Sequence, residues 1–173
     1  MANSETQKEQ TFLEYILELN EGRGIREALQ LSMDDLNAID VAQLKRIGLK
    51  TYAEGKWTIH TIFQHLIDWE RIWCFRCILF ARGEGSRPDA YDQEIMARNS
   101  NANNLTIEQL VNEIRIVRQS TIAMFESYDD KMLDINCEFY EYEMPLSALG
   151  HAITAHQIHH FNVIRERYLP LDK

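Results

Sequence analysis

The chain has 173 residues, 45% hydrophobic and 26% charged, which is the composition of a globular protein and not of a disordered one. Its formal net charge of −9 argues against nucleic acid and against an anionic membrane surface as partners, because both attract basic proteins. The N-terminus lacks the apolar core of a secretory signal, and no stretch approaches the roughly 18 apolar residues of a membrane span. We expect a soluble, cytoplasmic protein with a single domain over residues 1–173.

The first predicted element covers about residues 8–45, where apolar side chains recur at helical spacing. Gly22 and Gly24 are candidates to kink or divide this helix, and Asp40 to cap a short helical turn behind it. With 3 prolines and 7 glycines in the whole chain, few residues interrupt regular structure, which favours long helices.

The second predicted helix begins at Thr58, a suitable N-cap, and extends to Ala81 or Arg82. One face carries apolar residues together with a histidine and an arginine: Ile62, His65, Leu66, Trp69, Ile72, Trp73 and Arg76. Cys74 and Cys77 form a C-x-x-C pair, which suggests redox chemistry. However, they lie inside this helix with no βαβ pattern around them, so ordinary packing is the favoured interpretation.

Residues 83–104 contain loop-forming residues and show little periodicity. Such a connection is long enough to return along the second helix, so we expect a crossover that makes the next helix parallel to it. Thr106 and Gln109 fit a capping box at the start of that third helix. The last helix is predicted from about Pro145, in its first turn, to Tyr168. Before it comes a short irregular stretch with Cys137, Phe139, Tyr140 and Tyr142. The fold class is therefore all-α, a four-helix bundle with a long crossover between helices 2 and 3.

Four of the six histidines lie in the string HAITAHQIHH. On a helix, His156 and His160 are four residues apart and present their imidazoles to the same side, about 40° apart. That spacing suits two ligands of one metal ion. His159 borders this face, whereas His151 should point elsewhere. A solvated histidine face remains the alternative for this pair.

A third ligand has to come from another element. His65 is the best candidate, because it lies mid-helix on an apolar face where an imidazole would otherwise be buried without an obvious partner. His60 is turned away by about 140°. A core histidine bonded to a carbonyl group remains the alternative for His65. Three nitrogen ligands with an open position are typical of catalytic metal sites, since structural zinc sites have four protein ligands.

Two more specific metal motifs fail. HQIHH resembles the H-E-x-x-H of zinc proteases, but Gln157 occupies the position of the general base and cannot accept a proton. A di-iron carboxylate site needs Glu-x-x-His pairs, and none of the six histidines has a glutamate three residues before it.

Two segments together resemble a known family. GKWTIHTIFQHLIDWERIWCFRC resembles the second helix, and AITAHQIHHFNVIRERYL the last helix, of the DinB-like or YfiT-like superfamily of metal-binding four-helix bundles. ARGE, the Asp-Gln of AYDQEI and the Val-Arg-x-x-Thr of IVRQSTI follow in the expected order between them. The resemblance covers about residues 10–169.

The resemblance implies an up-down-down-up bundle whose metal ligands fall on His65, His156 and His160. It further implies zinc or nickel as the ion, a homodimer, and metal-assisted transfers or isomerisations that use low-molecular-weight thiols. Relatives with the most similar last helix carry a glutamate where this chain has Gln157. The resemblance therefore does not carry any acid–base or supporting role of that glutamate over to this chain.

We accordingly expect a metal-dependent enzyme, a thiol transferase or a hydrolase, whose ion activates a thiol or a water molecule. The alternative is a non-catalytic metal-binding or structural, stress-related protein. Asp68 and, less favourably, Glu70 are candidates to orient an imidazole, although solvated or ion-paired acids are more common. Arg76 and Arg118 are candidates either to hold an anionic substrate or to bridge neighbouring acids. The sequence names no substrate.

Overall fold

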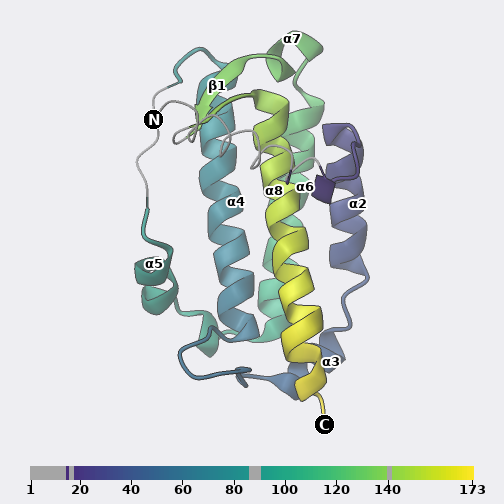
Figure 1. Ribbon diagram of the computed structural model, residues 1–173, viewed down its shortest axis with the longest axis vertical. Coiled ribbons are helices and arrows are strands. Elements are labelled where there is room, and N and C mark those ends of the chain that lie inside the picture. The colour runs from purple at the N-terminus through teal and green to yellow at the C-terminus, as the bar shows by residue number, and fades with distance from the viewer. Residues whose placement is uncertain (1–14, 16–17, 86–90, 140–141) are drawn as a thin grey trace.

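The computed structural model describes residues 15, 18–85, 91–139 and 142–173 (Figure 1). In this part of the chain, four long helices form the body of the molecule: α2 (Ile25–Asn37), α4 (Ile59–Ala81), α6 (Ile107–Glu126) and α8 (Leu146–Val163). Shorter elements connect them: α3 (Val41–Ile47), α5 (Gln93–Asn99), the 3₁₀ turn η1 (Ala102–Asn104), α7 (Asp130–Leu133), and the strands β1 (Asn136–Phe139) and β2 (Tyr142–Pro145). Beyond α8 the chain continues as a π-helical segment, η2 (Ile164–Tyr168), and a 3₁₀ turn, η3 (Leu169–Leu171).

The glycines divide the first helical region as predicted. Gly22 has a φ of 69°, which a side chain would disfavour, and Gly24 is the N-cap of α2. At the other end, the carboxylate of Asp40 accepts a hydrogen bond from the backbone N–H of Gln43 (3.0 Å) and starts α3. The part of the predicted segment before residue 15 lies outside the described residues.

The predicted starts of α4 and α6 are also confirmed. Thr58 Oγ1 accepts a hydrogen bond from the backbone N–H of Thr61 (3.1 Å). Thr106 and Gln109 form a complete capping box, in which each side chain accepts from the backbone N–H of the other residue (3.2 and 2.8 Å). Local chemistry therefore fixes where both helices begin.

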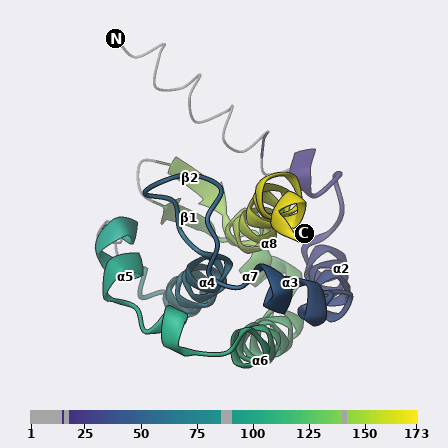
Figure 2. The same ribbon diagram turned by 90° about the horizontal axis from the view of Figure 1, so that it is seen from below.

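The crossover expected between the second and third helices is present. In Figure 1, α4 ends at the top of the bundle, α5 lies beside its lower half, and α6 begins at the bottom and runs parallel to α4. The end-on view of Figure 2 shows the four long helices as a square, in which α4 and α2 occupy opposite corners and each packs against both α6 and α8. The course is up-down-down-up, as the resemblance implied.

Two connections differ from their predictions. The segment expected to be irregular before the last helix contains an antiparallel hairpin of β1 and β2, with Cys137 opposite Met144. Pro145 is the N-cap of α8 and the last residue of β2, not a first-turn residue. The crossover also contains the short helix α5, started by the carboxylate of Asp92, which accepts from two backbone N–H groups. The all-α class holds apart from this small sheet.

The bundle core has two apolar clusters, one at each end. The cluster beside the hairpin includes Leu29, Trp73, Phe125 and Leu149. The cluster beside α3 includes Met33, Ile67, Ile114 and Ile164. Within the described part of the chain, no helix combines the length and apolar character that a membrane crossing requires.

Candidate metal centre

Three imidazoles converge between α4 and α8. His65 projects from α4, and His156 and His160 project from α8. His156 Nε2 lies 2.9 Å from His65 Nε2 and 3.1 Å from His160 Nε2. The three nitrogens lie within 4.8 Å of one another, and among the described residues this is the grouping that could hold a metal ion. We call these three residues the histidine cluster. The structure thus brings together the three predicted ligands.

The donor set fits a divalent ion better than it fits hydrogen bonding. An imidazole nitrogen either donates one hydrogen bond or accepts one, so His156 Nε2 cannot satisfy both neighbouring nitrogens. Zn–N bonds of about 2.0–2.1 Å at tetrahedral angles place ligand nitrogens about 3.3 Å apart. The observed spacing is within a few tenths of an ångström of that separation on two sides. An ion accommodates all three lone pairs at once.

The cluster is poised in its neutral form. Burial lowers the pKa of His65 to about 4, and burial together with the nearby His65 lowers the pKa of His160 to about 3. Burial and the neighbouring His160 and His65 also lower the pKa of His156 well below its usual range. Neutral imidazoles keep the lone pairs that a metal ion requires, so binding near pH 7 needs no proton release.

Three tryptophans surround the cluster. The sequence interpretation placed two of them, Trp69 and Trp73, on the helix face without assigning them a role. The ring centroids of Trp57 and Trp69 lie 4.8 and 4.9 Å from that of His65. Trp73 lies 5.1 Å from His156. The signal was present in the sequence, since Trp69 and Trp73 follow His65 at intervals of four residues. These rings pack directly against the imidazoles.

The remaining histidines lie outside the cluster. His60 Nδ1 is 3.1 Å from the carbonyl oxygen of Leu105, as expected of a structural histidine. His151 is buried elsewhere on α8, where burial lowers its pKa. His159 is exposed and borders the cluster, with its ring 5.2 Å from that of His160. The angular separations predicted from helix geometry are therefore correct.

The candidate supporting acids do not contact the imidazoles. Asp68 Oδ1 accepts a hydrogen bond from Gln64 Nε2 (2.9 Å), and among the described residues no hydrogen bond joins Asp68 to the cluster. Burial raises the pKa of this carboxyl group. Glu70 is buried and paired with Arg118, so for this pair the bridging alternative is correct. Arg76 lies over the ring of Tyr91, with its guanidinium carbon 5.6 Å from the ring centroid.

The two cysteines of the C-x-x-C pair are packed helix residues. Cys77 is fully buried in α4, and the thiol of Cys74 lies 3.2 Å from Thr121 Oγ1. Burial raises the pKa of Cys74 to about 12 and that of Cys77 as well. Neither is a reactive thiolate at neutral pH.

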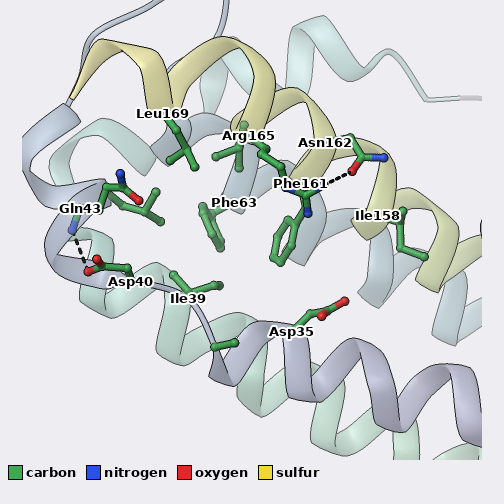
Figure 3. Close-up of a pocket in the computed structure, with 13 residues that line it drawn as sticks. Asp35, Ile39, Asp40, Gln43, Phe63, Ile158, Phe161, Asn162, Arg165 and Leu169 are labelled. Atoms are coloured by element: carbon green, nitrogen blue, oxygen red, sulfur yellow. Dashed lines mark hydrogen bonds between the residues drawn. The ribbon is translucent and has the colours of Figure 1, made fainter. Parts of the chain in front are cut away.

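A hollow of about 210 Å³ opens beside the cluster. His160 forms part of its wall, together with the aromatic rings of Trp57 and Tyr168 and the side chains of Lys56 and Glu94. A larger hollow, of about 350 Å³, lies between α3 and the end of α8 (Figure 3). Its described lining includes Phe63, Phe161 and Arg165 but none of the three clustered histidines. The smaller hollow is therefore the one that matters for chemistry at the cluster.

The protein is a four-helix bundle with a crossover connection. Three imidazoles converge between two of its helices, in a geometry that could hold a metal ion. The sequence profile of the DinB superfamily matches residues 25–164, and the chain belongs to this superfamily. Among solved structures, it is similar to YfiT from Bacillus subtilis, a probable metal-dependent hydrolase with an unusual four-helix bundle topology. The two share 18% sequence identity and a TM-score of 0.57, over 88% of this chain and 85% of that chain, which supports a shared fold. No curated protein matched the chain.

Proposed function

We propose that this protein is a divalent-metal-dependent enzyme in which His65, His156 and His160 hold the ion, and that its reaction is a hydrolysis. The observation that carries the proposal is the position of His160, which belongs to the histidine cluster and also lines a hollow. An ion held by three protein ligands beside a hollow keeps a coordination position for water, which is the arrangement of catalytic sites. The description of YfiT as a probable metal-dependent hydrolase agrees with this proposal.

A bound divalent ion supplies Lewis acidity, which lowers the pKa of a coordinated water or thiol and creates a nucleophile at neutral pH. The chain's own residues supply the rest. Three neutral imidazoles fix the ion's position, and the surrounding tryptophans limit access of bulk water. All-nitrogen ligation suits zinc or nickel, and we propose one of these as the ion.

The size and lining of the hollow favour a small substrate. About 210 Å³ lies below the usual range of pockets for drug-sized ligands, which is roughly 300–1,000 Å³. The hydroxyl of Tyr168 donates a hydrogen bond to the carbonyl oxygen of Trp57, which joins η2 to the loop before α4 and closes one side. Lys56 and Glu94 give the rim one charge of each sign.

A thiol is the second candidate nucleophile, because the same ion would lower its pKa. In that case the protein is a thiol transferase. The non-catalytic alternative predicts that the ion stabilises the bundle strongly and that no substrate reaches it. The hollow beside His160 argues against this alternative.

The test uses protein purified without a histidine tag, stripped with a chelator and reloaded with Zn²⁺ or Ni²⁺. We expect the loaded protein to hydrolyse members of a panel of small chromogenic esters, amides and phosphoesters, and to lose that activity on stripping. A parallel series with a small thiol as acceptor tests for transfer.

The matched variants are His65→Ala, which removes a ligand, and His60→Ala, which removes an imidazole of the same helix outside the cluster. Activity should disappear in the first and persist in the second. Full activity retained by metal-free wild-type protein or by His65→Ala would overturn the proposal. Tight metal binding with no turnover of any probe would favour the non-catalytic alternative.

A further inference from the structure

A layer of buried polar side chains lies between the two apolar clusters of the bundle. Each of the four long helices contributes to it, and every member is at most 3% exposed. We call this the polar layer; its members are Ser32 of α2, Glu70 of α4, Arg118 and Thr121 of α6, and Gln157 of α8. Polar groups in a helical core are costly unless each one is bonded, so their arrangement requires an explanation.

The centre of the layer is an ion pair. Arg118 donates to both carboxylate oxygens of Glu70, from Nε at 2.8 Å and from Nη2 at 2.9 Å. Thr121 Oγ1 donates to the same carboxylate (2.7 Å), and the remaining Nη1 of Arg118 donates to the hydroxyl of Ser32. The two charges balance. The fork-shaped guanidinium therefore fixes α2, α4 and α6 relative to one another.

Gln157 adds α8 to this layer. Its Nε2 donates a hydrogen bond to the backbone carbonyl oxygen of Ser32 (2.9 Å). The amide has one workable orientation, because a flipped amide would face the Ser32 carbonyl with its own oxygen. In the observed orientation Oε1 is buried and has no hydrogen-bond partner among the described residues. The contact to α2 is thus kept at the cost of an unsatisfied acceptor, which points to a role for it.

That role follows from the neighbour of Gln157 in the chain. His156 precedes it directly, and consecutive residues point about 100° apart around a helix. One side chain therefore meets His65 on α4, and the other meets Ser32 on α2. On α4, Glu70 lies five residues after His65. The polar layer therefore links the helix turn that carries His156 to the helix that carries His65, through α2 and α6.

We propose that Gln157 is a positioning residue of the metal centre, which holds His156 toward His65 by anchoring α8 to the polar layer. The inference rests on the proposed metal binding. Lone pairs that converge on an empty point repel one another, so the metal-free cluster needs such an anchor to stay preformed. Without it, the turn of α8 that carries His156 loses its hydrogen bond to α2, and the imidazole nitrogens move apart before an ion arrives.

The test compares Gln157→Met, which keeps the length of the side chain but removes the donor, with Thr154→Val. Thr154 is a matched control because it is fully buried on α8, two residues before His156, and its hydroxyl bonds to Asn20 Oδ1 (2.6 Å) instead of α2. The readouts are the Zn²⁺ dissociation constant, from competition with a chromogenic chelator, and the visible spectrum of the Co²⁺-loaded protein. Resistance to urea is measured in parallel.

We expect Gln157→Met to bind Zn²⁺ at least about tenfold more weakly, with an altered Co²⁺ spectrum, as for groups that orient metal ligands elsewhere. Thr154→Val should lose comparable stability and keep both metal properties. Wild-type affinity and spectrum in Gln157→Met would overturn the inference, and so would an equal loss in both variants. Should Gln157→Met not fold, Gln157→Asn is judged by the same criteria, since its shorter amide cannot reach Ser32.

The two proposals fail differently. Absence of metal binding in the wild-type protein overturns both. Normal metal binding and activity in wild-type protein, combined with unchanged binding in the Gln157 variants, overturns only the positioning role.

Discussion

The bundle contains two buried groups of polar side chains that meet the same problem in opposite ways. In the polar layer, a guanidinium and a carboxylate neutralise each other, and hydroxyl groups occupy their remaining bonding sites. In the histidine cluster, three neutral imidazoles point at one another, and hydrogen bonds among them cannot satisfy all three nitrogens. The ion pair of the polar layer is complete without any addition. The histidine cluster needs an ion.

This difference assigns the groups to different tasks. Removing one partner of a complete ion pair leaves an uncompensated charge in the core, so the polar layer should dominate stability. Removing one imidazole leaves no charge behind, because burial keeps the cluster neutral. The cluster should therefore dominate metal binding and contribute little to the stability of the metal-free protein.

The largest expected effect is that of Arg118→Ala. It leaves Glu70 buried at 3% exposure without its partner. The free energy of unfolding should fall by about 3–5 kcal/mol, the usual cost of breaking a buried pair. Urea denaturation of the metal-free protein measures it. A loss below 1 kcal/mol would contradict the assignment of stability to the polar layer.

The next largest effect is expected in the histidine cluster. His156→Ala removes the imidazole whose Nε2 lies close to both other ligands. Affinity for Zn²⁺ should fall at least about 100-fold, which equals about 2.7 kcal/mol. The metal-free variant should unfold at a urea concentration much closer to wild type than Arg118→Ala does. Calorimetric titration measures the affinity, and an unchanged dissociation constant would remove His156 from the site.

The third effect is the loss of stability at acidic pH, which we expect from the histidine cluster. An ordinary histidine takes up a proton near pH 6.5, but His65 in the folded protein does so only near pH 4 and His160 only near pH 3. Below pH 6.5 the unfolded chain therefore binds more protons, and stability falls with falling pH by up to about 1.4 kcal/mol per pH unit for each histidine.

Between pH 6.5 and 5 we accordingly expect the metal-free protein to lose about 1–2 kcal/mol for each of these two histidines. Urea denaturation at several pH values measures the slope. In the control variant His65→Ala/His160→Ala, the slope over this range should be shallower. An equal slope in wild type and this variant would show that the cluster is not buried in its neutral form.

The smallest expected effect concerns an exposed ion pair that belongs to neither group. Arg71→Ala breaks the pair of Arg71 Nη1 with Glu113 Oε1 (2.8 Å), which joins α4 and α6 just as the buried pair does. Arg71 follows Glu70 directly, but its side chain is 52% exposed. Exposed pairs contribute about 0–1 kcal/mol, so we expect a loss of at most about 0.5 kcal/mol. A loss comparable to that of Arg118→Ala would mean that burial does not decide the difference.

Much of the fold could be predicted because its signals are local. The caps at Thr58 and Thr106 depend on residues three positions away, and a long polar connection is enough to indicate a crossover. The hairpin before α8 was missed because its strands have four residues each, too short for an alternating pattern to stand out. The short helix α5 was missed because no residue of it is buried, so it carries no apolar periodicity.

In the candidate site, too, only the features that depend on nearby residues could be predicted. The sequence by itself determined that His156 and His160 share a helix face, because four residues make about one turn, and the resemblance to a known family supplied His65 as their partner. Only the tertiary structure brings His65 to His156, 91 residues away, and Glu70 to Arg118, 48 residues away. No local pattern encodes such contacts, since they depend on which helix faces meet after the crossover. For the same reason, the sequence pointed to a metal site, and the structure showed the polar layer that we propose holds it in place.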